Sequence, residues 1–295
     1  MTKPPREPRS KPPAPPAAAD GERIAKVIAR AGLASRRGAE AMIAAGRVAV
    51  NGRRIDSPAL NVTPKDRISV DDRPLAAPEP PRLWLYHKPV GLVTTMRDEK
   101  GRPTVFGALP PELPRVVSVG RLDLNSEGLL LLTNDGALKR RLELPETGWL
   151  RKYRVRVHGQ PDEAMLAPLR DGITVEGERF QPMQARIDRQ QGANAWLTIG
   201  IREGRNREIR RALQAVGLSV NRLIRTGYGP FQLGKLAAGA VQEVARPVLR
   251  DQLGLSFGSD PAPAPAPVRA PGPGTRRKRP AKAPTAPRPS PGKRR

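Results

Sequence analysis

The sequence contains no cysteine and only two histidines, His87 and His158. The missing cysteines exclude a disulfide scaffold, a thiol nucleophile and any thiolate-bound zinc or iron–sulfur centre. Two histidines also argue against a histidine-rich metal site. No apolar run approaches the roughly 18 residues of a membrane-spanning helix, and the N-terminus lacks the apolar core of a secretory signal. We therefore expect a soluble cytoplasmic protein that holds no metal and does not act at a membrane.

Positive charge is what the chain has in excess. It carries 53 Lys and Arg against 28 Asp and Glu, a formal net charge of +25. A polyanion is the expected partner of so basic a protein, and nucleic acid is the default. Arginine outnumbers lysine, which fits RNA because guanidinium groups pair with phosphate and stack on bases. Codon bias would produce the same excess and carries equal weight.

Both ends of the chain have the composition of disordered tails. Residues 261–295 contain 11 of the 35 prolines, ten Lys or Arg and no acidic residue, and residues 1–20 contain seven prolines. Such segments bury too little apolar surface to offset the entropy of ordering. We predict tails at 1–20 and 258–295. A membrane-surface or localisation role for the basic tail is the alternative, without an amphipathic helix or lipidation signal to support it.

The length of 295 residues predicts about two domains, and a proline-rich linker at 76–82 separates them. In the first, 21–80, apolar residues at helical spacing predict a helix over 24–31 and a second one ending at Ala45, with Ser35 as its N-cap. The Asn51-Gly52 pair predicts a hairpin turn, and a further strand is expected at 67–70.

Arginines of the first domain gather near the predicted helix ends and the turn, where they are suited to phosphate. By spacing alone, a solvated basic face explains them equally well. The residues at 34–43 and 46–52, however, closely resemble the S4 RNA-binding domain. This resemblance implies that the domain binds structured RNA, with candidate contacts at Arg36, Arg37, Arg47 and Arg53.

The second domain, 83–257, shows mostly β-type runs with interspersed helices, which favours an α+β fold over a doubly wound sheet. A helix is expected at 137–143, and another is expected to begin with Asn206 as its N-cap. The predicted strands are 83–87, 115–120, 129–132, 153–157, 180–187 and 195–201.

One carboxylate of this domain stands in a suggestive context. Asp123 lies just beyond a β-type run, beside Arg121 and between two glycines. A positioned, ionised carboxylate can act as a nucleophile or a general base. An ordinary Arg–Asp contact that pins the loop is the simpler interpretation. Glu127 and Asp135 also leave paired-carboxylate glycosidase chemistry open.

A second cluster is the run of five arginines at 202–211, at the start of a predicted helix. It predicts either a solvated basic helix end or a phosphate clamp beside an active site. Arg205 and Arg207 are its candidate RNA contacts.

Five sequence blocks in fixed order, following an S4-like domain, resemble the RNA pseudouridine synthases of the RsuA/RluB type. One is Gly-Arg-Leu-Asp at 120–123, and the others lie at 88–91, 126–136, 152–155 and 203–211. The resemblance covers nearly all of 21–257. It implies a catalytic domain built on a mixed, mainly antiparallel β-sheet.

The resemblance also implies roles for individual residues. Asp123 matches the catalytic aspartate, Arg121 the arginine that displaces the target base, and Tyr153 the aromatic that packs on the uracil. Ile209 would line the base pocket, and Arg210 would pair with Asp123. The reaction breaks the C1′–N1 bond and forms a C1′–C5 bond without net redox change, so we expect no cofactor.

The expected activity is therefore the isomerisation of a uridine in ribosomal RNA, with 23S favoured over 16S because of the basic tail. The partner would be ribosomal RNA or a ribosomal assembly intermediate, and we expect a monomer. A non-catalytic S4-type RNA-binding assembly factor is the main alternative, and a DNA-binding protein lacks a recognition-helix motif. The full set Asp123, Arg121, Tyr153 and Arg210 favours the enzyme, since a pure binder has no use for all four.

Overall fold

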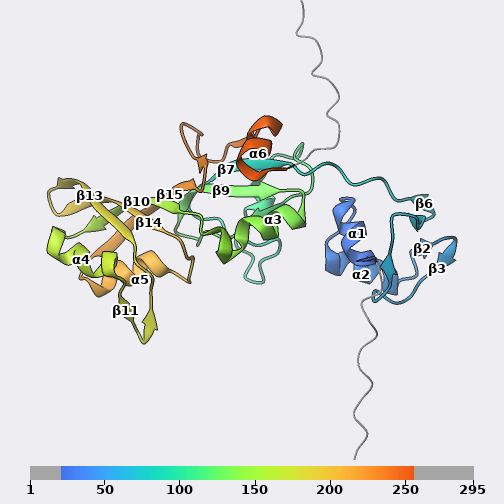
Figure 1. Cartoon of the computed structure of the whole chain (residues 1–295), viewed down its shortest axis with the longest axis horizontal. Helices are drawn as coiled ribbons and strands as arrows, with labels where there is room; N and C mark the ends of the chain where they lie inside the picture. The colour runs from blue at the N-terminus through green and yellow to red at the C-terminus, as the bar shows by residue number, and fades with distance from the viewer. Residues whose placement is uncertain (1–20, 256–295) are drawn as a thin grey trace, which may run out of the picture. The chain divides into compact units, whose positions relative to one another are not determined.

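The computed structural model describes residues 21–255 of the chain (Figure 1). The tails predicted at 1–20 and 258–295 lie outside the described residues. Within 21–255, every helix is too short or too polar to cross a bilayer.

The part that precedes residue 76 has a hydrophobic core of its own, which includes Ile24, Ile28, Ile43 and Val48. Two helices, α1 (Ile24–Arg30) and α2 (Arg36–Ala44), contact each other. A four-stranded sheet has the order β3-β2-β5-β6, and a separate strand pair is β1-β4. Their bounds are β1 Glu22–Arg23, β2 Val48–Val50, β3 Arg53–Arg54, β4 Asn61–Val62, β5 Ile68–Val70 and β6 Arg73–Pro74.

The local signals of this part are confirmed. The Ser35 hydroxyl accepts a hydrogen bond from the Gly38 amide at 2.9 Å, as an N-cap does. Asn51 and Gly52 both have positive φ, 52° and 80°. A two-residue hairpin of type I′ requires this conformation at both positions, so the turn falls where the Asn-Gly pair predicts it.

The part from residue 82 onward is built on a nine-stranded sheet with the order β13-β14-β10-β15-β9-β7-β17, in which β16 pairs with β15 and β8 with β9. Only β9 and β15 are parallel among the described strand pairs of this sheet, so the mixed, mainly antiparallel sheet of an α+β fold is confirmed. The bounds are β7 Leu83–Lys88, β8 Val117–Val119, β9 Glu127–Thr133, β10 Arg151–His158, β13 Gln184–Gln191, β14 Asn194–Ile201, β15 Ser219–Tyr228, β16 Phe231–Gln232 and β17 Val241–Glu243.

Helices cover one face of the strands β13, β14, β10 and β15. Along β10, Tyr153, Val155 and Val157 are buried, whereas the residues between them are exposed. Figure 1 shows α4 and α5 on the same side of these strands, and a hairpin of β11 and β12 contacts α5 through β11. The bounds are α3 Gly136–Glu143, α4 Glu163–Asp171, α5 Glu208–Ala215, α6 Arg246–Leu253, β11 Thr174–Val175, β12 Glu178–Arg179 and the 3-10 turns Phe106–Ala108 and Pro145–Thr147.

Two predicted boundaries are wrong. The strand predicted at 180–187 begins only at Gln184, because the amides of Phe180 and Met183 donate to the carbonyls of Ile173 and Leu169 at 2.8 Å instead of joining the sheet. The N-cap of α5 is Arg207 rather than Asn206. The helix start is fixed by the preceding turn and not by a capping side chain.

Gly128 lies near the start of β9, where this strand pairs in parallel with β15. Its φ is +101°, and a Cβ at this position would lie 2.3 Å from the Arg225 carbonyl oxygen. Only glycine lets the two parallel strands β9 and β15 approach this closely. The loop that carries Asp123 enters β9 at this junction.

Candidate active site

A cavity of about 620 Å³ opens at the sheet junction. Its walls come from the loop 120–126, from β10 and β15, and from the start of α5. The structure brings seven of the predicted site residues together in this wall: Arg121, Asp123, Tyr153, Arg205, Arg207, Ile209 and Arg210. The other four, Arg36, Arg37, Arg47 and Arg53, belong to the part before residue 76.

The backbone around Asp123 is fixed on both sides. The Thr94 hydroxyl donates to the Leu122 carbonyl at 2.8 Å and accepts from the Leu122 amide at 3.3 Å. The amide of Ser126 donates to the Asp123 carbonyl at 3.0 Å, and that of Gly91 to the Leu124 carbonyl at 2.9 Å. The side chain of Asp123 remains 40% exposed. The loop is thus held while its carboxylate faces open space.

Lys88 supports this loop from inside the protein. Its side chain is fully buried, and Nζ donates to the carbonyls of Pro89 at 2.9 Å and Ser126 at 2.8 Å. Burial lowers the pKa of Lys88 to about 8, against the opposing effect of the Asp123 and Glu127 charges. Sequence analysis identifies Lys88 only as part of the block 88–91 and predicts no function for it.

Two arginines of α5 and its N-cap flank Asp123. A guanidinium nitrogen of Arg207, Nη1, lies 3.7 Å from Oδ2 of Asp123. Within residues 21–255, Arg210 does not form the expected ion pair with Asp123. Its guanidinium group instead donates to the carbonyls of Asn125 at 2.8 Å and Val220 at 3.1 Å. Burial and the Arg207 charge lower the pKa of Arg210, while Asp123 raises it. Arg207 is the ion-pair partner that the structure gives to Asp123.

The apolar wall of the cavity is formed by Tyr153 and Ile209, which are 7% and 4% exposed. Arg225 lies opposite Tyr153 in the pairing of β10 with β15. It is also buried, and its Nε donates to the Leu129 carbonyl at 2.6 Å. Sequence analysis missed Arg225 because the strand that contains it was not predicted: its apolar residues Val220, Leu223 and Ile224 do not alternate with polar ones.

The other two candidate carboxylates are engaged elsewhere. Glu127 forms an ion pair with Arg222, with 2.5 Å between Oε1 and Nε, and this contact lowers the pKa of Glu127. Asp135 caps α3 by accepting from the amides of Ala137 and Leu138. Neither residue lines the cavity. Glu127 and Asp135 therefore do not supply the second carboxylate that glycosidase chemistry requires.

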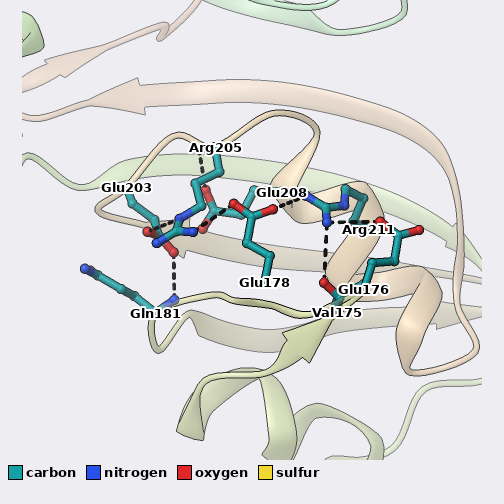
Figure 2. A network of polar contacts seen from close by, with 8 residues as sticks. All are labelled: Val175, Glu176, Glu178, Gln181, Glu203, Arg205, Glu208 and Arg211. Carbon is teal, nitrogen blue, oxygen red and sulfur yellow. Dashed lines mark hydrogen bonds and ion pairs between the residues drawn. The ribbon is translucent and has the colours of Figure 1, made fainter. Parts of the chain in front are cut away.

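Two of the five clustered arginines are already neutralised by acidic side chains (Figure 2). Arg205 contacts Glu203 and Glu178, each at 2.8 Å. Arg211 contacts Glu178 at 2.6 Å and Glu176 at 3.0 Å. The hydrogen bond to Glu178 is the main cause that raises the pKa of Arg205. The arrangement leaves Arg207, which is 50% exposed, as the better placed phosphate ligand of the cluster.

The arginines before residue 76 differ in how they are used. Arg36 and Arg37 at the start of α2, and Arg53 in the hairpin, are exposed. Arg47 instead donates two hydrogen bonds to Asp71, at 2.8 and 2.6 Å. Three of the four predicted contacts therefore point charge at solvent, and the fourth is bound to an acidic neighbour.

Known protein families match both parts of the chain. The family model described as RNA pseudouridylate synthase matches residues 82–215, and the S4 domain model matches residues 22–68. Among solved structures, one titled "Crystal structure of pseudouridylate synthase" is 27% identical and has a TM-score of 0.55. The match covers 78% of this chain and 99% of that one.

Relatives support the same assignment at higher identity. An uncharacterized RNA pseudouridine synthase of Rickettsia prowazekii is 45% identical over 80% of this chain and 99% of its own length. A ribosomal large subunit pseudouridine synthase B of Pasteurella multocida is 42% identical over 76% of this chain and 67% of its own length. This chain belongs to the RNA pseudouridine synthase family.

Proposed function

We propose that the protein isomerises a specific uridine of ribosomal RNA to pseudouridine, with Asp123 as the nucleophile. The observation that carries this proposal is a half-exposed carboxylate on a fixed loop, in a cavity with an aromatic wall and two flanking arginines. The large-subunit RNA is the favoured substrate, because several relatives are named for the large subunit. The small-subunit RNA is the second candidate.

The chemistry explains the composition of the cavity. The carboxylate must reach the sugar or the base, so the uridine has to leave its stack. The ring of Tyr153 offers a surface for the displaced base, with Ile209 beside it. Arg121 is exposed at the cavity wall and would fill the gap that the uridine leaves. Arg207 and Arg210 supply positive charge beside Asp123. None of these steps needs a metal or other cofactor.

We further propose a division of labour between the two parts of the chain. Residues 21–80 would bind structured RNA, chiefly through Arg36, Arg37 and Arg53, while Arg47 contributes less because Asp71 occupies it. Residues 83–257 would carry the reaction, and Arg207 would contact the RNA backbone near the target. Arg205 is the weakest candidate contact, since Glu178 and Glu203 compensate its charge.

The decisive experiment is pseudouridine mapping of total ribosomal RNA from cells that carry only the Asp123→Ala protein, beside cells with the wild type. We expect one site to disappear, which would identify the uridine and tie its modification to Asp123. An unchanged ribosomal map would contradict the proposal. It would favour the assembly-factor alternative or a substrate among transfer or messenger RNAs.

A further inference from the structure

Glu208 is a buried carboxyl group in the wall of the cavity, and the proposed reaction does not use it. It is the first residue of α5, directly after Arg207 in the sequence. Only 3% of it is exposed, and it lines the cavity. Burying an ionised carboxylate is costly unless a cation or several donors compensate it. Its partners therefore indicate which protonation state the site is built for.

The hydrogen bonds of Glu208 leave one oxygen without a donor. Oε2 accepts from the Arg205 amide at 3.0 Å, and the Glu208 amide donates to the Arg205 carbonyl at 3.4 Å. Oε1 is buried, and no described group donates a hydrogen bond to it. The carboxyl group of Glu203 is close enough to that of Glu208 to hydrogen-bond with it if one of the two carries a proton.

Glu203 already uses both of its own oxygens as acceptors. Oε1 accepts from the Gln181 amide at 2.7 Å, and Oε2 accepts from Nε of Arg205 at 2.8 Å (Figure 2). These contacts suit an ionised carboxylate. Two carboxyl groups can hydrogen-bond to each other only if one carries a proton. Oε1 of Glu208, which accepts no hydrogen bond from a described group, is free to carry that proton.

We infer that Glu208 is a neutral carboxylic acid that donates its proton to Glu203, and that this bond holds the turn 205–207 so that Arg207 stays beside Asp123. Glu208 is thus a positioning residue. The turn includes Arg207 in the left-handed conformation, with φ of 49°, which costs free energy unless its surroundings hold it. The consequence for catalysis rests on the proposed function, whereas the protonation state does not.

The electrostatics of the site agree with this geometry. Burial raises the pKa of Glu208 to about 7, and the charge of Glu203 acts in the same direction. The Arg205 amide and the Arg151 guanidinium on β10 act against them. The remaining charged groups of the network already compensate one another, and they are Arg205, Arg211, Glu176 and Glu178 (Figure 2). Above pH 7 both carboxyl groups would be ionised and would repel each other.

The protonation state can be measured without any RNA. In the full chain with ¹³C-labelled glutamate, the Glu208 carboxyl signal, assigned by its loss in Glu208→Gln, should titrate near pH 7. The Glu203→Gln variant should move this midpoint to lower pH, because it removes the neighbouring negative charge. Glu176→Gln changes an exposed member of the same network and should leave the midpoint unchanged. A Glu208 midpoint near pH 4 in the wild type would overturn the inference.

The positioning role predicts a pH signature in turnover. Glu208→Gln keeps a donor towards Glu203 and an acceptor for the Arg205 amide, but it does not titrate. The protonated fraction of a group with a pKa of about 7 falls about tenfold between pH 6 and pH 8. The ratio of kcat/KM, Glu208→Gln to wild type, should therefore rise up to about tenfold over this range. Parallel pH profiles of the two proteins would refute the positioning role.

The Glu208→Leu variant distinguishes the positioning role from a purely space-filling one, because leucine fills the space without a hydrogen-bond donor or acceptor. If it folds, its kcat should fall at every pH while Glu208→Gln does not follow it. Equal losses in both variants would also overturn the inference. If the wild type shows no turnover while the carboxyl still titrates near pH 7, the proposed function fails and the protonation state stands.

Discussion

The arginines before residue 76 and those after residue 82 serve different ends. Arg36, Arg37 and Arg53 are exposed, and none of the ion pairs within residues 21–255 includes them. In the second part, Arg225 is buried in the cavity wall, where it donates to the Leu129 carbonyl. The same residue type points outward for phosphate in one region and builds the walls of a cavity in the other. An arginine-rich composition therefore does not measure RNA contact area.

The strongest test of this contrast removes the chemistry and keeps the binding. Asp123→Ala should lower uridine isomerisation below about one-thousandth of the wild-type rate, because it removes the proposed nucleophile. RNA affinity should persist, since the exposed arginines are untouched. Single-turnover assays beside filter binding will show both effects. Substantial turnover by the variant would remove Asp123 from the mechanism.

The buried Arg225 should contribute to the free energy of unfolding. Arg225→Met leaves the Leu129 carbonyl without its donor inside the sheet, and such a loss costs about 1–3 kcal/mol. The matched change on the surface, Arg36→Met, should alter the free energy of unfolding by less than about 0.5 kcal/mol. Urea unfolding of the two variants provides the comparison. Equal losses would erase the distinction between the two sets of arginines.

In the part after residue 82, the aromatic ring of Tyr153 should contact the displaced base directly. Tyr153→Ala removes the surface for the displaced uracil, and base stacking is worth about 1–3 kcal/mol, so kcat/KM should fall about 10- to 100-fold. Tyr153→Phe keeps the ring and should retain more activity. Steady-state kinetics with unmodified RNA transcripts check this order. Equal losses in both variants would assign the function to the hydroxyl group.

The outward arginines should affect affinity and its dependence on salt. Replacing Arg36 and Arg37 together by Ala should weaken RNA binding and reduce the slope of log K against log salt by about one for each lost phosphate contact. The rate at saturating RNA should stay unchanged. An unaltered slope in a salt titration would mean that α2 does not face RNA.

Arg47→Ala provides the smallest expected effect and a control within the same domain. Its guanidinium holds Asp71 with two hydrogen bonds, so less of its charge is available to phosphate. We expect a smaller loss of RNA affinity than for Arg37→Ala in the same binding assay. A larger loss would show that RNA displaces Asp71.

Sequence analysis predicted the features that depend on near neighbours. The Ser35 cap and the Asn51-Gly52 turn are decided within four residues of chain, and both form as predicted. The block containing Asp123 was identified by resemblance, and its residues do line a cavity. The long strand β15 was missed. Its partners come from segments remote in sequence, which local spacing does not reveal.

Pairings between distant side chains could not be predicted from sequence either. Arg207, the N-cap of α5, and Arg210 in the first turn of that helix are three residues apart. Only the carbonyls of Asn125 and Val220 decide which of them is free to meet Asp123. Likewise, Glu203 and Glu208 look like two ordinary charged residues of a basic run. Glu208 is buried and Glu203 half-buried, and their positions depend on the Gln181 amide and on α5.

The parallel contact at Gly128 also affects the order in which the two parts of the chain can fold during synthesis. Gly128 meets Arg225 across 97 residues of chain, and this contact encloses the Asp123 loop. Strand β15 must therefore leave the ribosome before the cavity around Asp123 can close, and pairing over such a separation is slow. The arginine-bearing helices near the N-terminus have a separate core and emerge first. During synthesis, the part before residue 76 is thus expected to fold and become able to bind RNA well before the cavity that would modify RNA is complete.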